Sequence, residues 1–411
     1  MARMTEPASL EPPLILAANA RMPSARAQSV QLCRAAQAFQ GAGTDTVVLH
    51  AARRDTPRAR PEEVWAQLTT LPTASTSEGA AIPPRRGWPG LMAASCVDWI
   101  DLVPRPLQFI PARLQEWSFG RSAARIIQSR FQGARVLARD LEIAVHLLGR
   151  PGVALELHRV PGGRTRRRWL RRCVDGGMPV VAISGGVRGD LEALGVPPDR
   201  ITVEHDAHDP ALVDALPERA AARESLGLDP DAGVVLYAGG LLRWKGVDVL
   251  VDAARQDLLG GATVLIVGGM EADVAALRQR ATGLSTVQVL GHRAAHEIPS
   301  FLAAADVGVV PNRRTPRISS HHTSPLKVFE AMAAELPLVV SDLPSLRDVL
   351  RADEAVFVEP ESPEALGRGV VGLLEDAGER HALAARAHES VQANTWGARA
   401  RRILTFMERL A

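Results

Sequence analysis

The sequence predicts an α/β protein of two doubly wound, Rossmann-like domains that face each other across a cleft. Short apolar runs alternate with helical patterns of about 10–15 residues, which is typical of a parallel sheet covered by helices. The runs are rich in β-branched residues and nearly continuous in apolar residues, as strands buried on both faces should be. At 411 residues the chain is long enough for two such domains.

The expected strands divide into two sets of six. In the first half they are 14–20, 45–51, 134–140, 153–160, 179–185 and 201–207. In the second half they are 233–240, 263–269, 286–292, 307–312, 337–342 and 355–360. The boundary is placed near 208–232, where turn residues surround one short helix, and a loop rich in Pro, Ser, Thr and Gly is expected around 70–95. The predicted domains are therefore 1–207 and 208–390, followed by a closing helical segment over 391–411.

Composition excludes several classes of protein. Apolar residues make up 46% of the chain and charged residues 23%, as in a packed, soluble globular protein. A net charge of +2 argues against a dedicated nucleic-acid binder, so no nucleic-acid partner is expected. The three cysteines, Cys33, Cys96 and Cys173, are odd in number and widely spaced, which indicates neither a disulfide framework nor a metal cluster.

The same features predict a cytoplasmic location. An odd set of free cysteines suits a reducing compartment. No apolar run reaches the roughly 18 residues that span a bilayer. The segment PPLILAANA (12–20) is interpreted as the first strand rather than the core of a signal peptide, because its apolar run is short and glutamates precede it.

Lysine is rare in this chain and falls at two suggestive positions. The chain has 48 Lys and Arg residues, but the only lysines are Lys245 and Lys327. Each follows a predicted strand of the second half and lies at or near the start of a helix, and Gly268-Gly269 ends a third strand. Loops that follow parallel strands meet at one sheet edge, and helix N-termini with lysines favour anions. The pattern predicts an anion site, for which a diphosphate is the natural ligand.

Glu330 lies three residues after Lys327, on the same helix face. A carboxylate beside a phosphate site suits hydrogen bonds from the vicinal hydroxyls of a ribose. The alternative is that Lys327 and Glu330 form a simple exposed ion pair on the helix.

A set of motifs in the second half is specific in combination: YAGGLLRWKGVDVLVDA, LIVGG, VQVLGH, ADVGVVPN and SPLKVFEAMAAELPLVVSDLPSLRDVL. The first half adds ANARMPSARAQSVQLCRAAQAFQGAG, LARDL and LELH. With these motifs the sequence resembles the retaining glycosyltransferases of family 4, which have the GT-B fold. The resemblance covers nearly the whole chain except about 55–130 and implies that the last helix crosses back to the first domain.

The resemblance implies roles for individual residues. Lys245 and Lys327 would hold the diphosphate of a nucleotide-sugar donor, expected to be a UDP-sugar, and Glu330 would bind its ribose. His158 would approach the transferred sugar, and these four residues are the predicted catalytic set. Asn19 and Arg21 would meet the acceptor or the sugar. The other predicted donor-binding residues are Gly239, Gly240, Arg243, Gly269, His292, Arg293, His322, Ser324, Pro325 and Leu326.

Two positions depart from the family pattern. His322 stands where many members have a glutamate that reads sugar hydroxyls, and Gly240 stands where an arginine is common, so Arg243 is expected to supply that charge. These departures leave open a catalytically silent nucleotide-sugar-binding protein. A nucleotide-sugar epimerase is the other alternative, but it would normally show acid/base carboxylates, and Glu156 is expected to point away from His158.

The implied reaction moves a hexose to a glycan, lipid-linked or small-molecule acceptor with retention of anomeric configuration. Fixed positive charges can stabilise the departing diphosphate without a metal or other cofactor. The metal-binding DxD pattern occurs once, at Asp229-Pro230-Asp231, and is interpreted as a turn.

Two arginine-rich segments of the first half remain ambiguous. Residues 103–135 combine aromatic and aliphatic residues with six arginines and one acid, Glu116. They could contact the inner face of a membrane or form amphipathic helices with solvated arginines. Residues 162–177 carry six arginines beside Trp169 and could steer an anionic acceptor or form a solvated helix.

Overall fold

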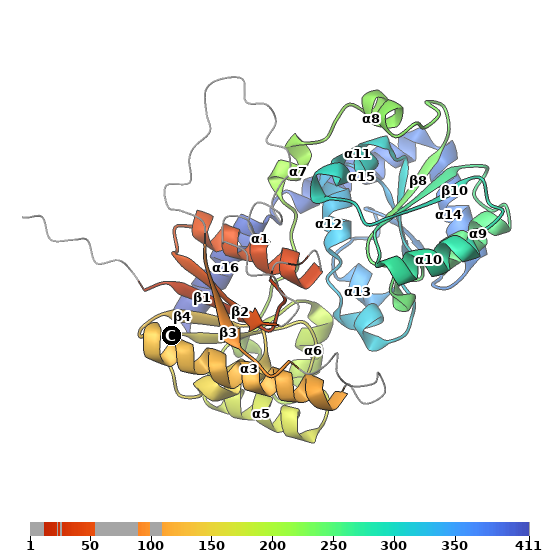
Figure 1. Cartoon of the computed structure of the whole chain (residues 1–411). Coiled ribbons are helices and arrows are strands. Elements are labelled where there is room, and N and C mark those ends of the chain that lie inside the picture. Colours follow the sequence, from red (N-terminus) through yellow and green to blue (C-terminus); the bar gives the residue numbers. More distant parts are fainter. Residues whose placement is uncertain (1–11, 23, 25–26, 54–88, 99–108, 411) are drawn as a thin grey trace, which may run out of the picture.

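The computed structural model describes residues 12–22, 24, 27–53, 89–98 and 109–410. Within these ranges the chain forms two parallel sheets, of seven and six strands, each covered by helices on both faces (Figure 1). All twelve predicted strands are present, and the predicted fold class is confirmed.

The first sheet has the strand order β3-β2-β1-β4-β5-β6-β7. Its strands are β1 (Leu14–Ala18), β2 (Thr46–Ala52), β3 (Gly90–Ser95), β4 (Arg135–Ala138), β5 (Val153–Leu157), β6 (Val180–Ala182) and β7 (Ile201–Val203). The strand β3 was not predicted and lies inside the segment expected to be a loop. Its sequence, GLMAAS, contains no β-branched residue, and it pairs only with β2 at the edge of the sheet.

The two faces of the first sheet are covered by different helices. Alternate residues of a strand point to opposite faces, so Leu14 and Leu16 pack on one side of β1, and Ile15 and Ala17 on the other. The first side is covered by α1 (Ala27–Gly41) and α16 (Trp396–Arg409). The second side is covered by α3 (Phe109–Arg130), α4 (Leu141–Ala144), α5 (Arg164–Asp175) and α6 (Gly185–Ala193).

The second sheet has the order β10-β9-β8-β11-β12-β13. Its strands are β8 (Val234–Ala238), β9 (Thr263–Val267), β10 (Val287–Gly291), β11 (Val307–Val310), β12 (Leu338–Ser341) and β13 (Val356–Val358). Its helices are α7 (Pro210–Asp214), α8 (Arg219–Ser225), α9 (Val247–Arg255), α10 (Glu271–Arg280), α11 (Ile298–Ala304), α12 (Leu326–Ala333), α13 (Pro344–Arg347), α14 (Pro363–Glu375) and α15 (Ala377–Val391).

Several helices begin at a side chain that caps the first turn. The cap accepts a hydrogen bond from a backbone N–H group that has no partner within the helix, which stabilises the helix start. The capping residues are Ser184 of α6, Asp209 of α7, Ser362 of α14, Asp376 of α15 and Thr395 of α16.

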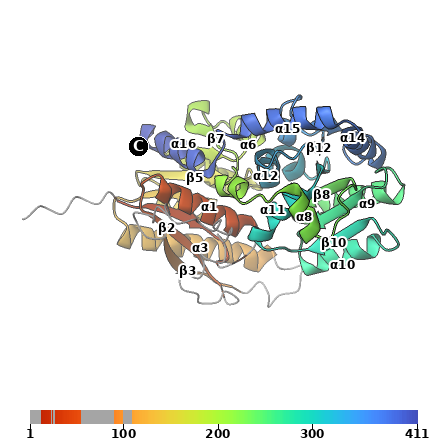
Figure 2. The ribbon, with the colours of Figure 1, turned by 90° about the horizontal axis from the view of Figure 1, so that it is seen from above.

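The chain crosses between the sheets twice, at adjacent points. The N–H group of His208 donates to the carbonyl of Asn394 at 3.2 Å, and the N–H group of Trp396 donates to the carbonyl of His208 at 3.2 Å. After the second crossing α16 returns to the first sheet and packs beside α1, as the resemblance implied (Figure 2).

The apolar residues of the arginine-rich segment 103–135 are divided between the protein core and the surface. Residues 103–108 lie outside the described residues. Phe119 and Ile127 of α3 are fully buried in the core, whereas Leu114 and Trp117 are exposed. Among the described residues, no helix combines the length and apolar character needed to cross a bilayer.

Candidate functional site

A cavity of about 400 Å³ lies between the two sheets, at the ends of their strands. Ligands of doubly wound domains bind at this edge because the loops that follow the parallel strands converge there. From the first domain it is lined by Gln31 of α1 and by His158, Ile183 and Asp206, which follow β5, β6 and β7. From the second it is lined by residues after β8 and β11, by the turn 318–322 and by the start of α12.

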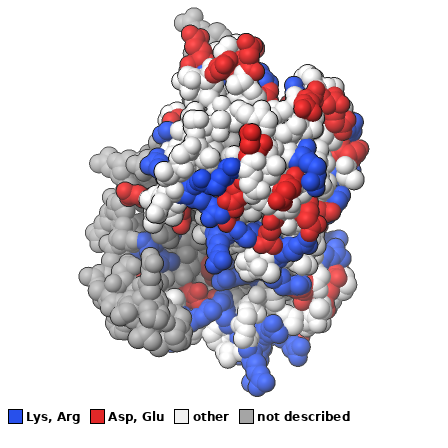
Figure 3. Space-filling model, turned by 90° about the vertical axis from the view of Figure 1, so that its right-hand side faces the viewer, with Lys and Arg blue, Asp and Glu red and all other residues white. Residues whose placement is uncertain are grey.

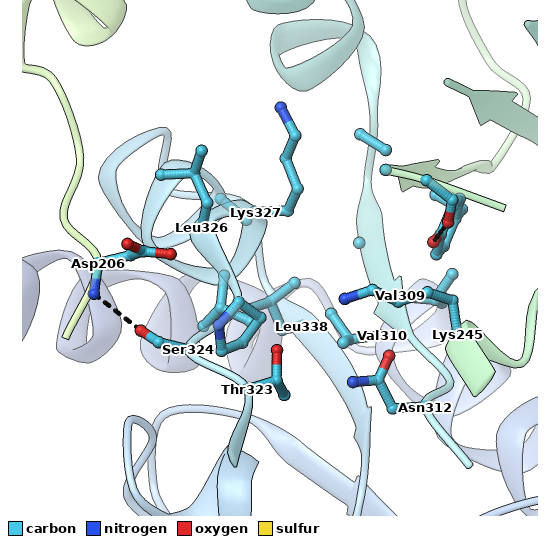
Figure 4. Close-up of a pocket in the computed structure, with 18 of the residues that line it drawn as sticks. Asp206, Lys245, Val309, Val310, Asn312, Thr323, Ser324, Leu326, Lys327 and Leu338 are labelled. Carbon is cyan, nitrogen blue, oxygen red and sulfur yellow. Dashed lines mark hydrogen bonds between the residues drawn. The ribbon is translucent and has the colours of Figure 1, made fainter. Parts of the chain in front are cut away.

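Lys245 enters the cavity from the second sheet, and Asp206 lies on the opposite side (Figure 4). The lysine ends a short 3-10 turn, Arg243–Lys245, and its Nζ lies 4.3 Å from the centre of the Trp244 ring. Burial lowers the pKa of Lys245 to about 8, and the Asp206 carboxylate offsets part of this effect. The site therefore holds a cation that an incoming anion would stabilise.

Lys327 is the second residue of α12 and also lines the cavity. Its Nζ lies 2.7 Å from Oε2 of Glu330, one turn further along the helix. The ion pair that was the simpler alternative is thus present. It does not remove Lys327 from the cavity, however, because 38% of that side chain is still exposed.

Asn312 follows β11 and carries an unpartnered amide group. Its side chain is fully buried, lines the cavity and lies next to Lys245 (Figure 4). Among the described residues, neither Oδ1 nor Nδ2 of Asn312 has a hydrogen-bond partner. A buried amide without a partner is unfavourable in the empty protein, so this group is positioned to bind a ligand.

Glycine backbone forms another part of the cavity edge. Gly239 and Gly240 line the cavity, and the hydroxyl of Tyr237 donates to the carbonyl of Gly240 at 2.6 Å. Gly268 has φ +112°, and a Cβ atom there would lie 2.1 Å from the carbonyl oxygen of Gly239. The loops after β8 and β9 therefore approach so closely that glycine is required at 268.

The first-sheet wall contains a buried group of charges around His158. Oε1 of Glu156 lies 2.7 Å from Nε2 of His158 and 3.0 Å from Nε of Arg139, and Oε2 lies 3.3 Å from Nη2 of Arg399 on α16. Burial opposes ionisation of Glu156, but Arg139 and Arg399 outweigh it and hold the pKa of that carboxyl well below its usual range. Burial and then Arg139 lower the pKa of His158, so its imidazole is neutral near pH 7.

The expectation that Glu156 points away from His158 was wrong. The two residues are two positions apart, and side chains at that spacing lie on the same side of an extended chain. The alternation of the strand therefore brings them together instead of separating them.

Asp206 joins the two walls. Its backbone N–H group donates to Oγ of Ser324 at 2.8 Å, and its Oδ2 accepts from Nε2 of Gln31 at 2.6 Å. Burial raises the pKa of Asp206 to about 7, although Arg399 and Arg139 act in the opposite direction. This carboxyl group can gain or lose a proton near neutral pH.

His322 lines the cavity, but its ring is engaged by the other half of the chain. Its Nε2 lies 2.8 Å from Oδ2 of Asp190 on α6, which also accepts from Nε of Arg317 at 2.9 Å. Close beside it, a Cβ atom on Gly186 would lie 1.9 Å from the carbonyl oxygen of His321. At the position of the family glutamate, this chain thus makes a contact between the two halves.

The cavity brings together nine of the predicted site residues: His158, Gly239, Gly240, Lys245, His322, Ser324, Pro325, Leu326 and Lys327. Glu330 is adjacent through its ion pair with Lys327. The predicted residues that do not line this cavity are Arg243, Gly269, His292, Arg293, Asn19 and Arg21.

Of these residues, Arg243 and Arg293 belong to the second half of the chain and Asn19 to the first. Arg243 is exposed on its turn, and Arg293 lies 4.0 Å from Glu297 beyond β10. Asn19 follows β1, where its N–H group donates to Oδ2 of Asp140 at 2.6 Å. Their roles stay predictions.

The lining residues that were not predicted include Gln31, Asp206, Trp244, Asn312 and Thr323. Asp206 and Asn312 lie at the carboxyl ends of the predicted strands 201–207 and 307–312, which is the one signal that could have identified them. The Asp229-Pro230-Asp231 motif forms a turn in which the N–H group of Asp231 donates to Oδ1 of Asp229 at 2.9 Å. Among the described residues, no three His, Cys, Asp or Glu side chains are grouped so that they could hold a metal ion.

Comparison with known sequences connects the second half of the chain to a family. Residues 232–376 match the family model described as Glycosyl transferases group 1. D-inositol 3-phosphate glycosyltransferase 1 of Catenulispora acidiphila is 30% identical over 228 residues, which cover 52% of this chain and 53% of that protein. Alpha-maltose-1-phosphate synthase of Mycolicibacterium smegmatis is 28% identical over 247 residues, covering 56% and 57%. The chain spans about half the length of these curated relatives.

Comparison with solved structures covers nearly the whole chain. Sucrose-phosphate synthase from Thermosynechococcus elongatus has a TM-score of 0.73 at 18% identity, over 97% of this chain and 99% of that chain. Anabaena HepE in complex with UDP and glucose has a TM-score of 0.68 at 17% identity, over 97% and 99%. Together with the two parallel sheets, these similarities establish the GT-B fold.

Proposed function

We propose that this GT-B chain, whose residues 232–376 match the group 1 glycosyl transferases, is a metal-independent, retaining glycosyltransferase. It moves a hexose from a nucleoside-diphosphate sugar, a UDP-sugar, to a glycan, lipid-linked or small-molecule acceptor. The observation that carries the proposal is one cavity in which Lys245, Lys327 and the unpartnered amide of Asn312 border a largely apolar wall.

The cavity suits a donor that is anionic at one end. Aliphatic residues of β8, β11 and β12 line much of it, so charges inside interact more strongly than they would in water. A diphosphate would stabilise the protonated form of Lys245, whose pKa burial lowers, and the amide of Asn312 would donate to a phosphate or sugar oxygen. The solved structure of Anabaena HepE, which contains UDP and glucose, supports a UDP-sugar as this donor.

The proposed chemistry is electrostatic. When the bond between the anomeric carbon and the phosphate oxygen breaks, negative charge grows on the diphosphate and positive charge on the sugar ring. Lys245, Lys327 and the backbone N–H groups at the start of α12 stabilise the departing diphosphate more in the transition state than in the ground state. The acceptor hydroxyl attacks on the face that the diphosphate leaves and passes its proton to the departing diphosphate oxygen, so the anomeric configuration is retained.

His158 would act on the sugar from the opposite wall. Nε2 of His158 lies beside both Oε1 of Glu156 and Nη2 of Arg139, so Nδ1 is the ring nitrogen that remains for a hydrogen bond with a sugar hydroxyl. Arg139 and Arg399 keep Glu156 ionised, so its Oε1 remains a hydrogen-bond acceptor beside the ring. Glu330 remains the proposed ribose ligand, beside the lysine that holds the diphosphate.

Calorimetric titration with UDP, GDP, ADP and TDP and their glucose conjugates tests the donor site. We expect one diphosphate to bind, and Lys327→Ala to weaken it about 10- to 100-fold, since a hydrogen bond to a charged group contributes about 1.5–3 kcal/mol. Asn312→Leu should weaken binding in the same way without lowering the melting temperature of the empty protein, because it removes an unpartnered buried amide. Arg401→Ala, an exposed change on α16, is the matched control.

Three outcomes would contradict parts of the proposal. Unchanged affinity in both Lys327→Ala and Asn312→Leu would show that these groups do not hold the donor. Loss of sugar transfer on chelation would overturn the metal-free mechanism. A product of inverted configuration, seen by NMR of the new linkage, would overturn retention.

Epimerisation of a nucleotide sugar is a second candidate, because Glu156 and His158 are in contact at the cavity after all. Incubation of the donor alone, followed by NMR, distinguishes the two activities: a new nucleotide-sugar isomer without any acceptor supports an epimerase. Tight binding with neither transfer nor isomerisation supports the remaining alternative, a catalytically silent nucleotide-sugar-binding protein.

A further inference from the structure

Helix α5 presents five arginines to solvent on one face. Arg164, Arg167, Arg168, Arg171 and Arg172 are exposed, while the opposite face packs into the core of the first domain. The ion pairs recorded for α5 among the described residues belong to the sixth arginine, which turns inward to the neighbouring helices. The outer face of α5 is therefore a cluster of cations without bound carboxylates in the described part of the chain.

Helix α3 lies beside α5 and adds exposed apolar residues to this surface. Leu114 is 37% exposed and Trp117 is 38% exposed, and they are two of the few large apolar side chains that reach the surface in the described residues. Arg121 lies over the Trp117 ring at 5.5 Å, and Arg125 is exposed one turn further on. The spacing of three and four residues places all four on one stripe of the helix.

The two helices border a shared hollow. A depression of about 430 Å³ is lined by Arg113 and Trp117 of α3 and by the start of α5 with Trp169. In Figure 1 both helices lie at the lower end of the molecule, on the sheet face away from α1 and α16. At the lowest part of the face shown in Figure 3 the charged side chains are almost all blue, among uncharged white atoms, whereas red and blue are mixed above it.

This concentration of charge is local. The whole chain carries a net charge of only +2, yet the twelve residues of α5 contain six arginines and one acid, Asp175. A surface of this kind produces a strong local field even though the protein as a whole is nearly neutral.

We infer that the α3/α5 face, formed by the exposed arginines of α5 with Leu114, Trp117, Arg121 and Arg125 of α3, docks on an anionic lipid bilayer. Arginines near an anionic membrane surface are attracted to its headgroups, and the attraction falls with salt. Leucine and tryptophan gain free energy by entering the interfacial layer, where a soluble polyanion would offer them nothing comparable. The combination of both kinds of residue on one face favours a bilayer.

Docking in this orientation has a consequence for the cavity. Helix α5 follows β5, so it begins at the strand edge that also holds His158. Lipid would then lie close to the first-sheet wall, and, if the proposed function holds, a lipid-linked acceptor could reach the donor without leaving the membrane.

Vesicle sedimentation with the full chain tests the inference without any sugar. We expect binding to vesicles with roughly 30% phosphatidylglycerol at low salt, little binding to pure phosphatidylcholine, and release at about 0.3 M salt. The triple variant Arg167→Glu, Arg168→Glu, Arg171→Glu should reduce the apparent affinity at least about tenfold, and Trp117→Ser about threefold. Nucleotide binding by these variants should be unchanged, so that failure of docking and failure of the donor site are distinguishable.

The matched control reverses the charge of three exposed arginines elsewhere in the chain: Arg368→Glu on α14, and Arg401→Glu and Arg409→Glu on α16. It should bind vesicles like the wild type. Equal losses in the control and in the α5 variant would overturn the inference, because binding would follow total charge. An absence of vesicle binding at low salt would also overturn the inference. An unchanged vesicle affinity of Trp117→Ser would overturn it too, and would assign the face to a soluble polyanion.

Discussion

The two walls of the cavity are built on the same kind of sheet but by different means. The second-sheet wall consists of aliphatic strands, closely packed glycines and two lysines, with the amide of Asn312 left without a partner in the described structure. The first-sheet wall is a network in which Glu156 already binds His158, Arg139 of the loop after β4, and Arg399 of α16. One wall is prepared for a ligand that brings its own charge. The other is electrostatically complete before any ligand arrives.

This difference predicts which kind of substitution should destabilise each wall. The second-sheet wall depends on close packing of glycine backbone, so an added side-chain atom should destabilise it, and the desolvation of Lys245 destabilises the empty protein. The first-sheet wall depends on the balance of its charges, so removal of one member leaves the others buried and uncompensated. Four substitutions test this contrast, in order of decreasing expected effect.

Arg399→Met should cause the largest loss of stability, about 3–5 kcal/mol, because it leaves Glu156 buried beside one fewer cation. Urea denaturation followed by circular dichroism measures the change. Arg401→Met, an exposed arginine of the same helix, should change stability by less than about 0.5 kcal/mol. Similar values for the two variants would show that the network contributes little.

Gly268→Ala should destabilise the protein by about 3 kcal/mol, since the new methyl group would meet the Gly239 carbonyl in a backbone conformation that alanine rarely adopts. Gly283→Ala is the control, because Gly283 also has a positive φ, of +82°, but no atom within 4 Å of its would-be Cβ. That change should cost only about 1 kcal/mol. The difference between the two losses of stability, measured by thermal denaturation, gives the cost of the steric overlap with the Gly239 carbonyl. Equal losses would mean that backbone strain at a positive φ accounts for the whole effect.

Lys245→Met should stabilise the empty protein by about 2 kcal/mol at pH 7, with the gain disappearing as pH rises to about 10. The pKa of Lys245 falls from 10.5 to about 8 on burial, so between these values the unfolded chain holds a proton that the folded chain has released. Stability of the wild type therefore rises with pH across this window, and the variant lacks this rise. Lys245→Arg keeps its charge and should show no such recovery; thermal denaturation at a series of pH values compares all three proteins.

Asp190→Asn should have the smallest effect on stability, about 0.5–1 kcal/mol, because Arg317 is largely exposed. Its consequence should instead be geometric, since Asp190 connects α6 to the turn that carries His322 and Arg317. Small-angle scattering should show a larger radius of gyration than in the wild type. Arg188→Ala, which breaks a pair within α6, should leave the radius unchanged.

The second-sheet wall was largely predictable from sequence, and the first-sheet wall was not. Lys245, Lys327 and Gly239 follow strands of one sheet in short, recognisable motifs, and helix α12 begins at Leu326, as the position of Lys327 suggested. Arg399 lies far along the chain from Glu156, and nothing local to either residue indicates that they meet. Long-range ion pairs of this kind depend on how the last helix packs, which residue patterns do not encode.

Two further features that the sequence did not predict, strand β3 and the role of Asn312, have local causes. Strand β3 has few strand-forming residues and is held by pairing with β2, so tertiary contact outweighed propensity. Asn312 gives no local signal, because a polar residue at the end of a predicted strand is ordinary, and its lack of a partner among the described residues is visible only once its neighbours are placed.

The return of α16 to the first sheet affects the order in which the chain can fold during synthesis. Domains generally fold as units, with the N-terminal one first as the chain leaves the ribosome. Here residues 396–409 supply part of the core around α1, including Trp396 and Ile403, so that core stays open until the second sheet has been translated. The half that is synthesised first is thus completed last. The face of its sheet that α16 covers stays exposed, and therefore prone to aggregation, until that helix has been synthesised.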